Sequence, residues 1–128
     1  MPLAKIEIVK GRSEEYKAEL FNSVHDALVN AVSMQEGNCN IRLYELDESC
    51  FRRKAGKTEK FTLIEFTIFP GRSAEKKKAL ILEINKLLGE RLQITPNDIF
   101  IVINEPPIEN WGFLGIQASE LEMNKSKG

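Results

Sequence analysis

The sequence is poor in the residues that build metal centres and disulfide scaffolds. It has 2 cysteines, Cys39 and Cys50, and 1 histidine, His25, in 128 residues. The cysteines show neither Cys-x-x-Cys spacing nor the density of a secreted scaffold, so we expect reduced thiols and no metal site. His25 lies between apolar residues of a predicted helix, where we expect a helix-packing residue, with a place beside a functional site as the alternative.

Long apolar runs and an excess of one charge are also missing. No apolar stretch approaches the roughly 20 residues that cross a bilayer, and no signal segment opens the chain, so we expect a cytoplasmic protein that binds no membrane. Lys+Arg 18 nearly balance Asp+Glu 19. The basic clusters at 52–54 and 76–78 are interpreted as solvated charge, so nucleic acid is not an expected partner.

What the sequence does contain is an internal repeat. Residues 10–20 read KGRSEEYKAEL and residues 70–80 read PGRSAEKKKAL, so Gly-Arg-Ser recurs 60 residues later. A strand-like run precedes each motif, LAKIEIV at 3–9 and LIEFTIF at 63–69. Ser13 and Ser73 are suited to cap the amphipathic helices that follow.

Each predicted helix leads to a further strand, NIRLYEL at 40–46 and IFIVI at 99–103. The repeat is therefore a βαβ unit used twice, which predicts an α+β fold with a four-stranded mixed sheet and two helices on one face. We expect one domain over 1–128, with pseudo-repeats at about 2–46 and 62–104, a connector at 47–61 and a C-terminal flap at 105–128. The uncovered sheet face, apolar in IFIVI, predicts an oligomer.

The proline after the start methionine distinguishes the first unit from the second. The counterpart of Pro2 in the second unit is Thr62. If Met1 is removed, Pro2 becomes a secondary amine whose pKa would fall through burial and nearby guanidinium groups. Such an amine could act as a general base or a nucleophile, whereas the simpler interpretation is a proline that only begins a strand.

The Met-Pro start, short strand, Gly-Arg-Ser turn and amphipathic helix, arranged in βαβ units, resemble the tautomerase superfamily of 4-oxalocrotonate tautomerase. The resemblance covers Pro2 to about Ala118, and the segment NEPPIENWGFLGIQASE is similar to the end of fused two-unit members. It implies a cofactor-free enzyme in which the N-terminal proline moves a proton and arginines hold a small carboxylate substrate. For a fused chain it also implies a homotrimer.

The resemblance assigns roles to particular residues. It implies that Pro2 is the general base and acid, and that Arg72 from the second unit serves the Pro2 site. Arg12 would face the pseudo-site headed by Thr62 and therefore ranks lower. Arg42 would be a second substrate-binding arginine, with a salt bridge at a sheet edge or subunit interface as the alternative.

Three further positions bear on the pocket and the reaction. Trp111 and Phe113 resemble the aromatic wall of the family's pocket, although packing of a C-terminal flap would explain them as well. Asn38 stands where decarboxylase-like members carry a water-activating aspartate, and no extra arginine precedes Arg72. We therefore expect a tautomerase of a 2-oxo acid. The alternatives are a decarboxylase, dehalogenase or hydratase that uses the same proline, and a non-catalytic trimeric binding protein.

Overall fold

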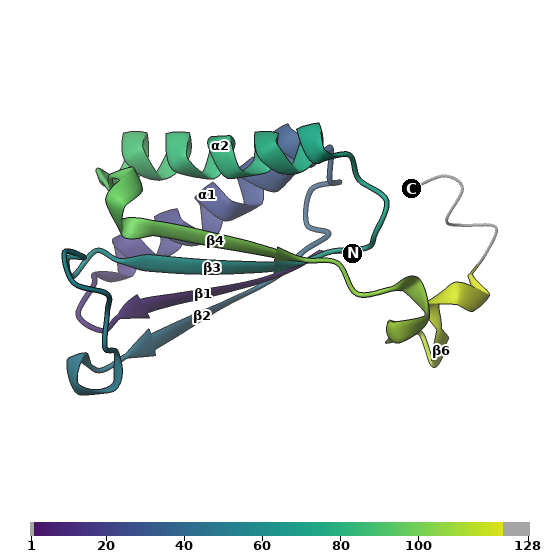
Figure 1. Ribbon diagram of the computed structural model, residues 1–128, viewed down its shortest axis with the longest axis horizontal. Coiled ribbons are helices and arrows are strands. Elements are labelled where there is room, and N and C mark those ends of the chain that lie inside the picture. Colours follow the sequence, from purple (N-terminus) through teal and green to yellow (C-terminus); the bar gives the residue numbers. More distant parts are fainter. Residues whose placement is uncertain (1, 122–128) are drawn as a thin grey trace.

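The computed structural model describes residues 2–121, and these form a sheet covered by two helices on one face (Figure 1). The first unit consists of β1 (Leu3–Val9), α1 (Glu14–Val32) and β2 (Asn40–Leu46), and the second of β3 (Thr62–Thr67), α2 (Ala74–Leu92) and β4 (Ile99–Asn104). The strand predicted at 63–69 thus begins one residue earlier and ends two residues earlier. The other predicted strands agree within a residue.

The sheet has four strands in the order β2-β1-β3-β4. Pairing is parallel within each unit and antiparallel between β1 and β3, in a register that joins Ile6 to Ile64. The predicted mixed sheet of two tandem βαβ units is confirmed. Because β1 and β3 run in opposite directions, the start of β1 lies beside the end of β3. The Gly-Arg-Ser turn after β1 and the one after β3 therefore lie at opposite ends of the sheet.

The two Gly-Arg-Ser turns have nearly the same local structure. Gly11 and Gly71 have φ of 120° and 119°, a backbone conformation that side chains with a Cβ rarely adopt. The hydroxyls of Ser13 and Ser73 then accept hydrogen bonds from the third backbone amide that follows, at 3.1 and 3.2 Å. Both serines are therefore N-caps, as predicted. The arginine between glycine and serine in each motif is thereby held just before the start of its helix.

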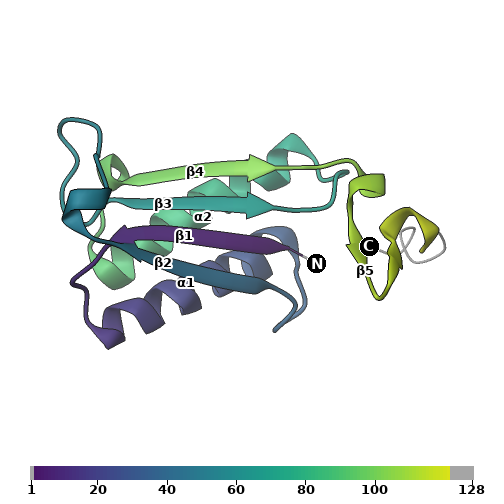
Figure 2. The same cartoon turned by 90° about the horizontal axis from the view of Figure 1, so that it is seen from below.

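The core lies between the helices and the covered face of the sheet. Each helix buries an apolar stripe there, which consists of Leu20, Val24, Ala27 and Leu28 on α1 and of Leu80, Ile84, Leu87 and Leu88 on α2. Ala31 packs against the core and is partly buried. The opposite sheet face carries no helix (Figure 2). Phe100, Tyr44 and Val102 are exposed there at 54%, 42% and 37%, with Lys5 and Glu65 between them 3.7 Å apart.

The remaining segments lie at the two ends of the sheet. The connector, predicted as a loop or short hairpin, is a loop with one 3₁₀ turn at Glu48–Cys50. The chain after β4 forms a 3₁₀ turn at Ile108–Asn110, a hairpin of β5 (Gly112–Phe113) and β6 (Ile116–Gln117), and a turn at Ala118–Glu120. Residues 122–128 of the predicted flap lie outside the described part. Within residues 2–121, neither helix has the length and apolar character needed to span a membrane.

Candidate active site

A cavity of about 1100 Å³ opens at the end of the sheet where β1 begins. Four segments surround it: the start of β1, the turn after α1, the Gly-Arg-Ser turn before α2, and the C-terminal segment, which lies beside the N-terminal end of β1 (Figure 1). Of the seven predicted site residues it brings together four. They are Pro2, Arg72, Phe113 and Asn38.

Pro2 lines the cavity and is held there by the pairing of β1 with β2. It is buried, and its carbonyl oxygen accepts a hydrogen bond of 3.3 Å from the amide of Asn40 at the start of β2. This bond continues the parallel ladder of β1 and β2 to the first residue of the strand. The proline is therefore held at the end of the sheet, where it lines the cavity.

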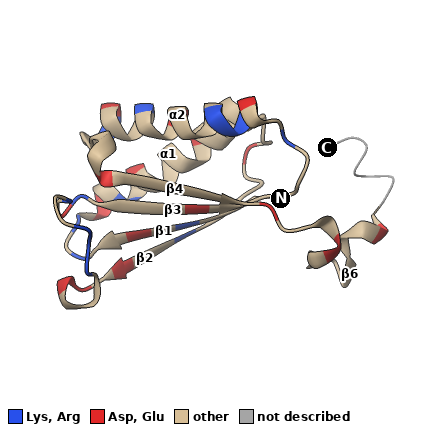
Figure 3. Cartoon of the chain, in the orientation of Figure 1, with Lys and Arg blue, Asp and Glu red and all other residues tan. Residues whose placement is uncertain are grey.

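The cavity wall opposite the first unit is basic. Arg72 precedes the N-cap of α2, and Lys76 lies one helical turn later; both line the cavity. Within residues 2–121 neither side chain forms an ion pair, and no acidic residue lines the cavity. Figure 3 shows the basic residues gathered at the first turn of α2. Two uncompensated cations beside the free amides of a helix start form an environment that favours a carboxylate.

Lys76 is not among the site residues predicted from the sequence, where the basic cluster at 76–78 is interpreted as solvated charge. The side chain is indeed exposed, but it also reaches the cavity. Helical spacing could not indicate this, because Arg72 precedes the N-cap Ser73 and is not part of the helix that carries Lys76. Lys77, its neighbour, points to Glu105 instead, with 2.8 Å between Nζ and Oε1.

The aromatic residues of the C-terminal segment form a layer behind the cavity. Phe113 lines it and stacks on Phe69, with ring centroids 6.1 Å apart and planes at 24°. Trp111 packs against the other side of the cluster, 4.6 Å from Phe69 and nearly perpendicular, and its Nε1 donates to the carbonyl oxygen of Pro106. Trp111 thus supports the wall without lining the cavity.

Two predicted arginines lie away from Pro2. Arg12 is at the opposite end of the sheet, after the end of β1, where Ile8 pairs with Thr62, and its guanidinium lies 6.0 Å from the ring centre of Tyr16. Arg42 is exposed on the uncovered sheet face, level with Lys5 in the register and 6.0 Å from the ring of Tyr44. The chain itself therefore supplies Pro2 with one arginine, Arg72.

Neither cysteine nor histidine forms part of a metal site among residues 2–121. Burial raises the pKa of the Cys39 thiol to about 11, so it stays protonated at neutral pH and is a poor nucleophile. His25 is partly buried on α1 and does not line the cavity. A second hollow, of about 550 Å³ at the β5–β6 hairpin, has Glu109 as its one charged lining residue among those described.

Comparison with known proteins now identifies the family. Two models, both described as tautomerase enzyme, match residues 2–38 and 40–114, so the chain belongs to the tautomerase family and is an enzyme. It is 28% identical over 127 residues to the probable tautomerase YusQ of Bacillus subtilis (strain 168), covering 95% of this chain and all of that protein. The 2-hydroxymuconate tautomerase of Comamonas testosteroni is 39% identical over 51 residues, covering 40% of this chain and 81% of that protein.

Solved structures share the fold across nearly the whole chain. One, described as a fused 4-OT wild-type asymmetric trimer, has a TM-score of 0.85 at 24% identity, covering 94% of this chain and 98% of that one. A malonate semialdehyde decarboxylase has a TM-score of 0.81 at 20% identity, with 95% and 98% covered. At these identities the likeness shows the fold alone.

Proposed function

We propose that the protein is a cofactor-free tautomerase that interconverts the enol and keto forms of a 2-oxo acid, with Pro2 as the proton carrier. The observation that supports this most is the position of the buried Pro2 in a cavity that, among residues 2–121, is lined by two cations without ion-pair partners and by no acidic residue. Removal of Met1 would free the amine. Burial and the adjacent cations would then lower its pKa, so that the neutral base is available near neutral pH.

In the proposed reaction the neutral amine of Pro2 takes the proton of the enol hydroxyl, and the protonated amine then gives a proton to carbon 3 of the substrate. The C=C bond becomes a C–C single bond while the C–O bond becomes a carbonyl, and no atom is gained or lost. Arg72 holds the carboxylate and stabilises the negative charge that develops on the 2-oxygen. Phe113 covers the opposite side and limits the access of water.

Decarboxylation or hydration would use the same proline with an activated water. Asn38 occupies the cavity where a carboxylate could activate that water, and a neutral amide is no base. Nothing in the cavity favours this second reaction over proton transfer.

The decisive experiment is ketonisation of phenylenolpyruvate by protein whose intact mass shows that Met1 has been removed. Positioned acid–base groups contribute about 10²- to 10⁴-fold, and Pro2→Ala should lower kcat/KM by that amount. Its circular dichroism and melting temperature should match those of the wild type. Wild-type turnover in Pro2→Ala would refute the role of Pro2, and a wild type without activity would refute the proposed substrate class.

We also propose that the enzyme is a homotrimer that buries the uncovered sheet face. Phe100, Tyr44 and Val102 support this, because large apolar side chains so exposed on one face are typical of an interface. The similar fused 4-OT chains are described as trimers. On that face Arg42 would be placed to approach a neighbouring subunit. Analytical ultracentrifugation should give a mass of about three chains, and a monomer would contradict the proposal.

A further inference from the structure

The turn between α1 and β2 forms one side of the cavity. Ser33, Met34, Gln35 and Asn38 all line it. Most of this turn is exposed, and its internal hydrogen bond from the amide of Asn38 to the carbonyl of Gln35, 3.1 Å, is local. Met34 anchors the start of the turn, because it is buried and its amide donates to the carbonyl of Leu28 at 3.2 Å, whereas residues 35–38 are exposed. A contact that fixes this exposed part therefore also determines the shape of the cavity beside it.

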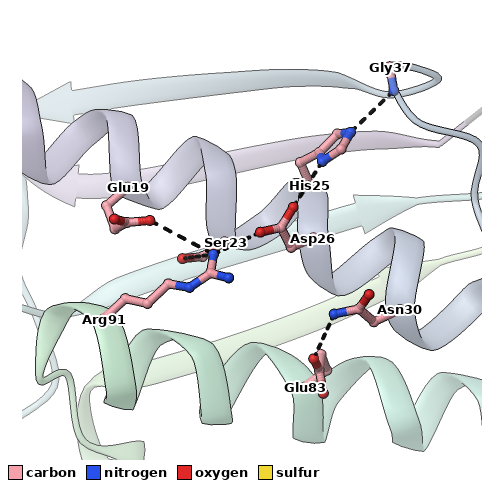
Figure 4. Close-up of polar contacts among 8 residues, drawn as sticks. All are labelled: Glu19, Ser23, His25, Asp26, Asn30, Gly37, Glu83 and Arg91. Atoms are coloured by element: carbon pink, nitrogen blue, oxygen red, sulfur yellow. Dashed lines mark hydrogen bonds and ion pairs between the residues drawn. The ribbon is translucent and has the colours of Figure 1, made fainter.

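His25 connects this turn to the body of the protein. Its Nε2 accepts a hydrogen bond from the backbone amide of Gly37, with 3.2 Å between the nitrogens (Figure 4). An amide nitrogen is always the donor, so Nε2 must present a lone pair. The imidazole is therefore neutral and carries its proton on Nδ1.

Asp26 holds the ring in that tautomer. Its Oδ1 lies 3.2 Å from His25 Nδ1, which donates, and its Oδ2 lies 3.0 Å from Nη1 of Arg91 on α2. These bonds, that from His25 above all, lower the pKa of the Asp26 carboxyl, so it remains an acceptor. Arg91 is fixed in turn by Ser23 at 3.4 Å and Glu19 at 3.8 Å (Figure 4).

We propose that His25 is a positioning residue, which holds the cavity-lining turn through the Gly37 amide, and that Asp26 and Arg91 keep its ring in the accepting tautomer. A chain of contacts then runs from α2 through α1 to the substrate side of the cavity. The inference rests on the proposed function for its catalytic consequence. Its structural part, the clamp formed by the hydrogen bond from the Gly37 amide to His25 Nε2, can be measured without any substrate.

The test compares His25→Leu, which removes the acceptor, with His25→Gln, whose side-chain oxygen can replace Nε2. Asn30→Leu is the matched control, because Asn30 Nδ2 donates to Glu83 across the two helices at 3.0 Å and, among the described residues, Asn30 has no hydrogen bond to the turn (Figure 4). Hydrogen exchange of the Gly37 amide is followed by NMR. Ketonisation of phenylenolpyruvate gives KM and kcat.

Loss of one hydrogen bond changes an equilibrium by about threefold to tenfold. His25→Leu should speed Gly37 exchange and raise KM by that factor, while kcat stays within about twofold because the β1–β2 ladder still holds Pro2. His25→Gln should restore both values, and Asn30→Leu should change neither. Unchanged Gly37 exchange in His25→Leu, or the same acceleration in Asn30→Leu, would overturn the proposal.

Two measurements keep the outcome clear if a variant does not fold or the wild type does not turn over phenylenolpyruvate. The ¹⁵N shifts of the wild-type imidazole should report a protonated Nδ1, and a protonated Nε2 would refute the clamp. In an inactive wild type, the apparent Kd of phenylpyruvate, read from the same amide spectra, replaces KM. Equal affinities of wild type and His25→Leu for phenylpyruvate would then reject the positioning role. The inactivity of the wild type would count only against the proposed reaction.

Discussion

The two ends of the sheet are built from the same βαβ unit, yet their charges differ. Among residues 2–121, two cations and no carboxylate line the cavity at one end, whereas the other end combines Arg12 with the buried carboxylate of Asp98. The repeat of 60 residues allows the ends to be compared position by position. In sequence it relates Pro2 to Thr62, Arg72 to Arg12, Lys76 to Tyr16, and Asn38 to Asp98.

The scaffold around these positions is the same at both ends. Lys17 binds Glu45 near the end of β2 at 3.1 Å, and its counterpart Lys77 binds Glu105, the residue after β4, at 2.8 Å. Each helix start is thus tied to the end of the second strand of its own unit. The N-caps are also equivalent. The ends therefore differ in the side chains that meet between the units, while the backbone frame that presents them is preserved.

The difference in charge is largest at Asp98. Its carboxylate is buried and accepts hydrogen bonds from the amide and hydroxyl of Thr58, at 2.9 and 2.6 Å, which ties the connector to the sheet. Asp98 also acts on the nearby Tyr16, whose pKa is raised mainly by burial. With a buried carboxylate at Asp98 and threonine in place of Pro2, the far end lacks the proposed base and is less favourable for an anion than the Pro2 end.

Equivalent substitutions at the two arginines should give the largest difference in activity between the two ends. Arg72→Ala should lower kcat/KM for phenylenolpyruvate about 100-fold, because it removes the group proposed to bear the carboxylate and the developing charge. Arg12→Ala should leave kcat/KM within about twofold. Equal losses in the two variants would mean that the far end takes part in catalysis or that both act through folding, which melting temperatures distinguish.

Exchanging the amide of Asn38 for the carboxylate found at the far end tests the charge argument. Asn38→Asp should raise KM for phenylenolpyruvate about tenfold, since a negative charge in the cavity repels the substrate carboxylate. Asn38→Ala is the control for lost contacts. Assay with 3-haloacrylates shows at the same time whether an added base introduces hydration. An unchanged KM in Asn38→Asp would show that the cavity does not discriminate by charge at this position.

The fold could be predicted from the sequence because its strongest signals are local and occur twice. Gly-Arg-Ser, with a capping serine after a glycine of positive φ, marks the turn between strand and helix and determines where each helix begins. The grouping of Pro2 with Arg72 was implied by the family resemblance. The antiparallel pairing of β1 and β3 gives its physical reason, because it brings the start of β1 beside the end of β3.

The rest of the cavity depends on irregular backbone, which leaves no periodic signal. Trp111 and Phe113 belong to a segment with two-residue strands, and only its packing on Phe69 shows which ring faces the cavity. The partner of His25 is an amide twelve residues later in a turn, and nothing in the composition indicates it. Arg42 occupies a sheet face that a single chain leaves open.

The smallest expected effect concerns Lys76, whose counterpart at the far end is Tyr16. An exposed charge acts on a ligand through solvent, so it contributes less than a partly buried arginine with two donors. Lys76→Met should lower kcat/KM for a dicarboxylate such as 2-hydroxymuconate by about threefold and that for phenylenolpyruvate by less. A second carboxylate has more to gain from a second cation.

Salt provides the sharper readout for this variant. The loss in Lys76→Met should shrink as ionic strength rises towards about 1 M, where screening acts over roughly 3 Å. Lys78→Met, which removes an exposed lysine of the same turn that does not line the cavity, is the matched control. If both variants lose the same activity, the effect belongs to the net charge of the helix start. A loss confined to Lys76 and removed by salt would place its ammonium group in the field that attracts the substrate.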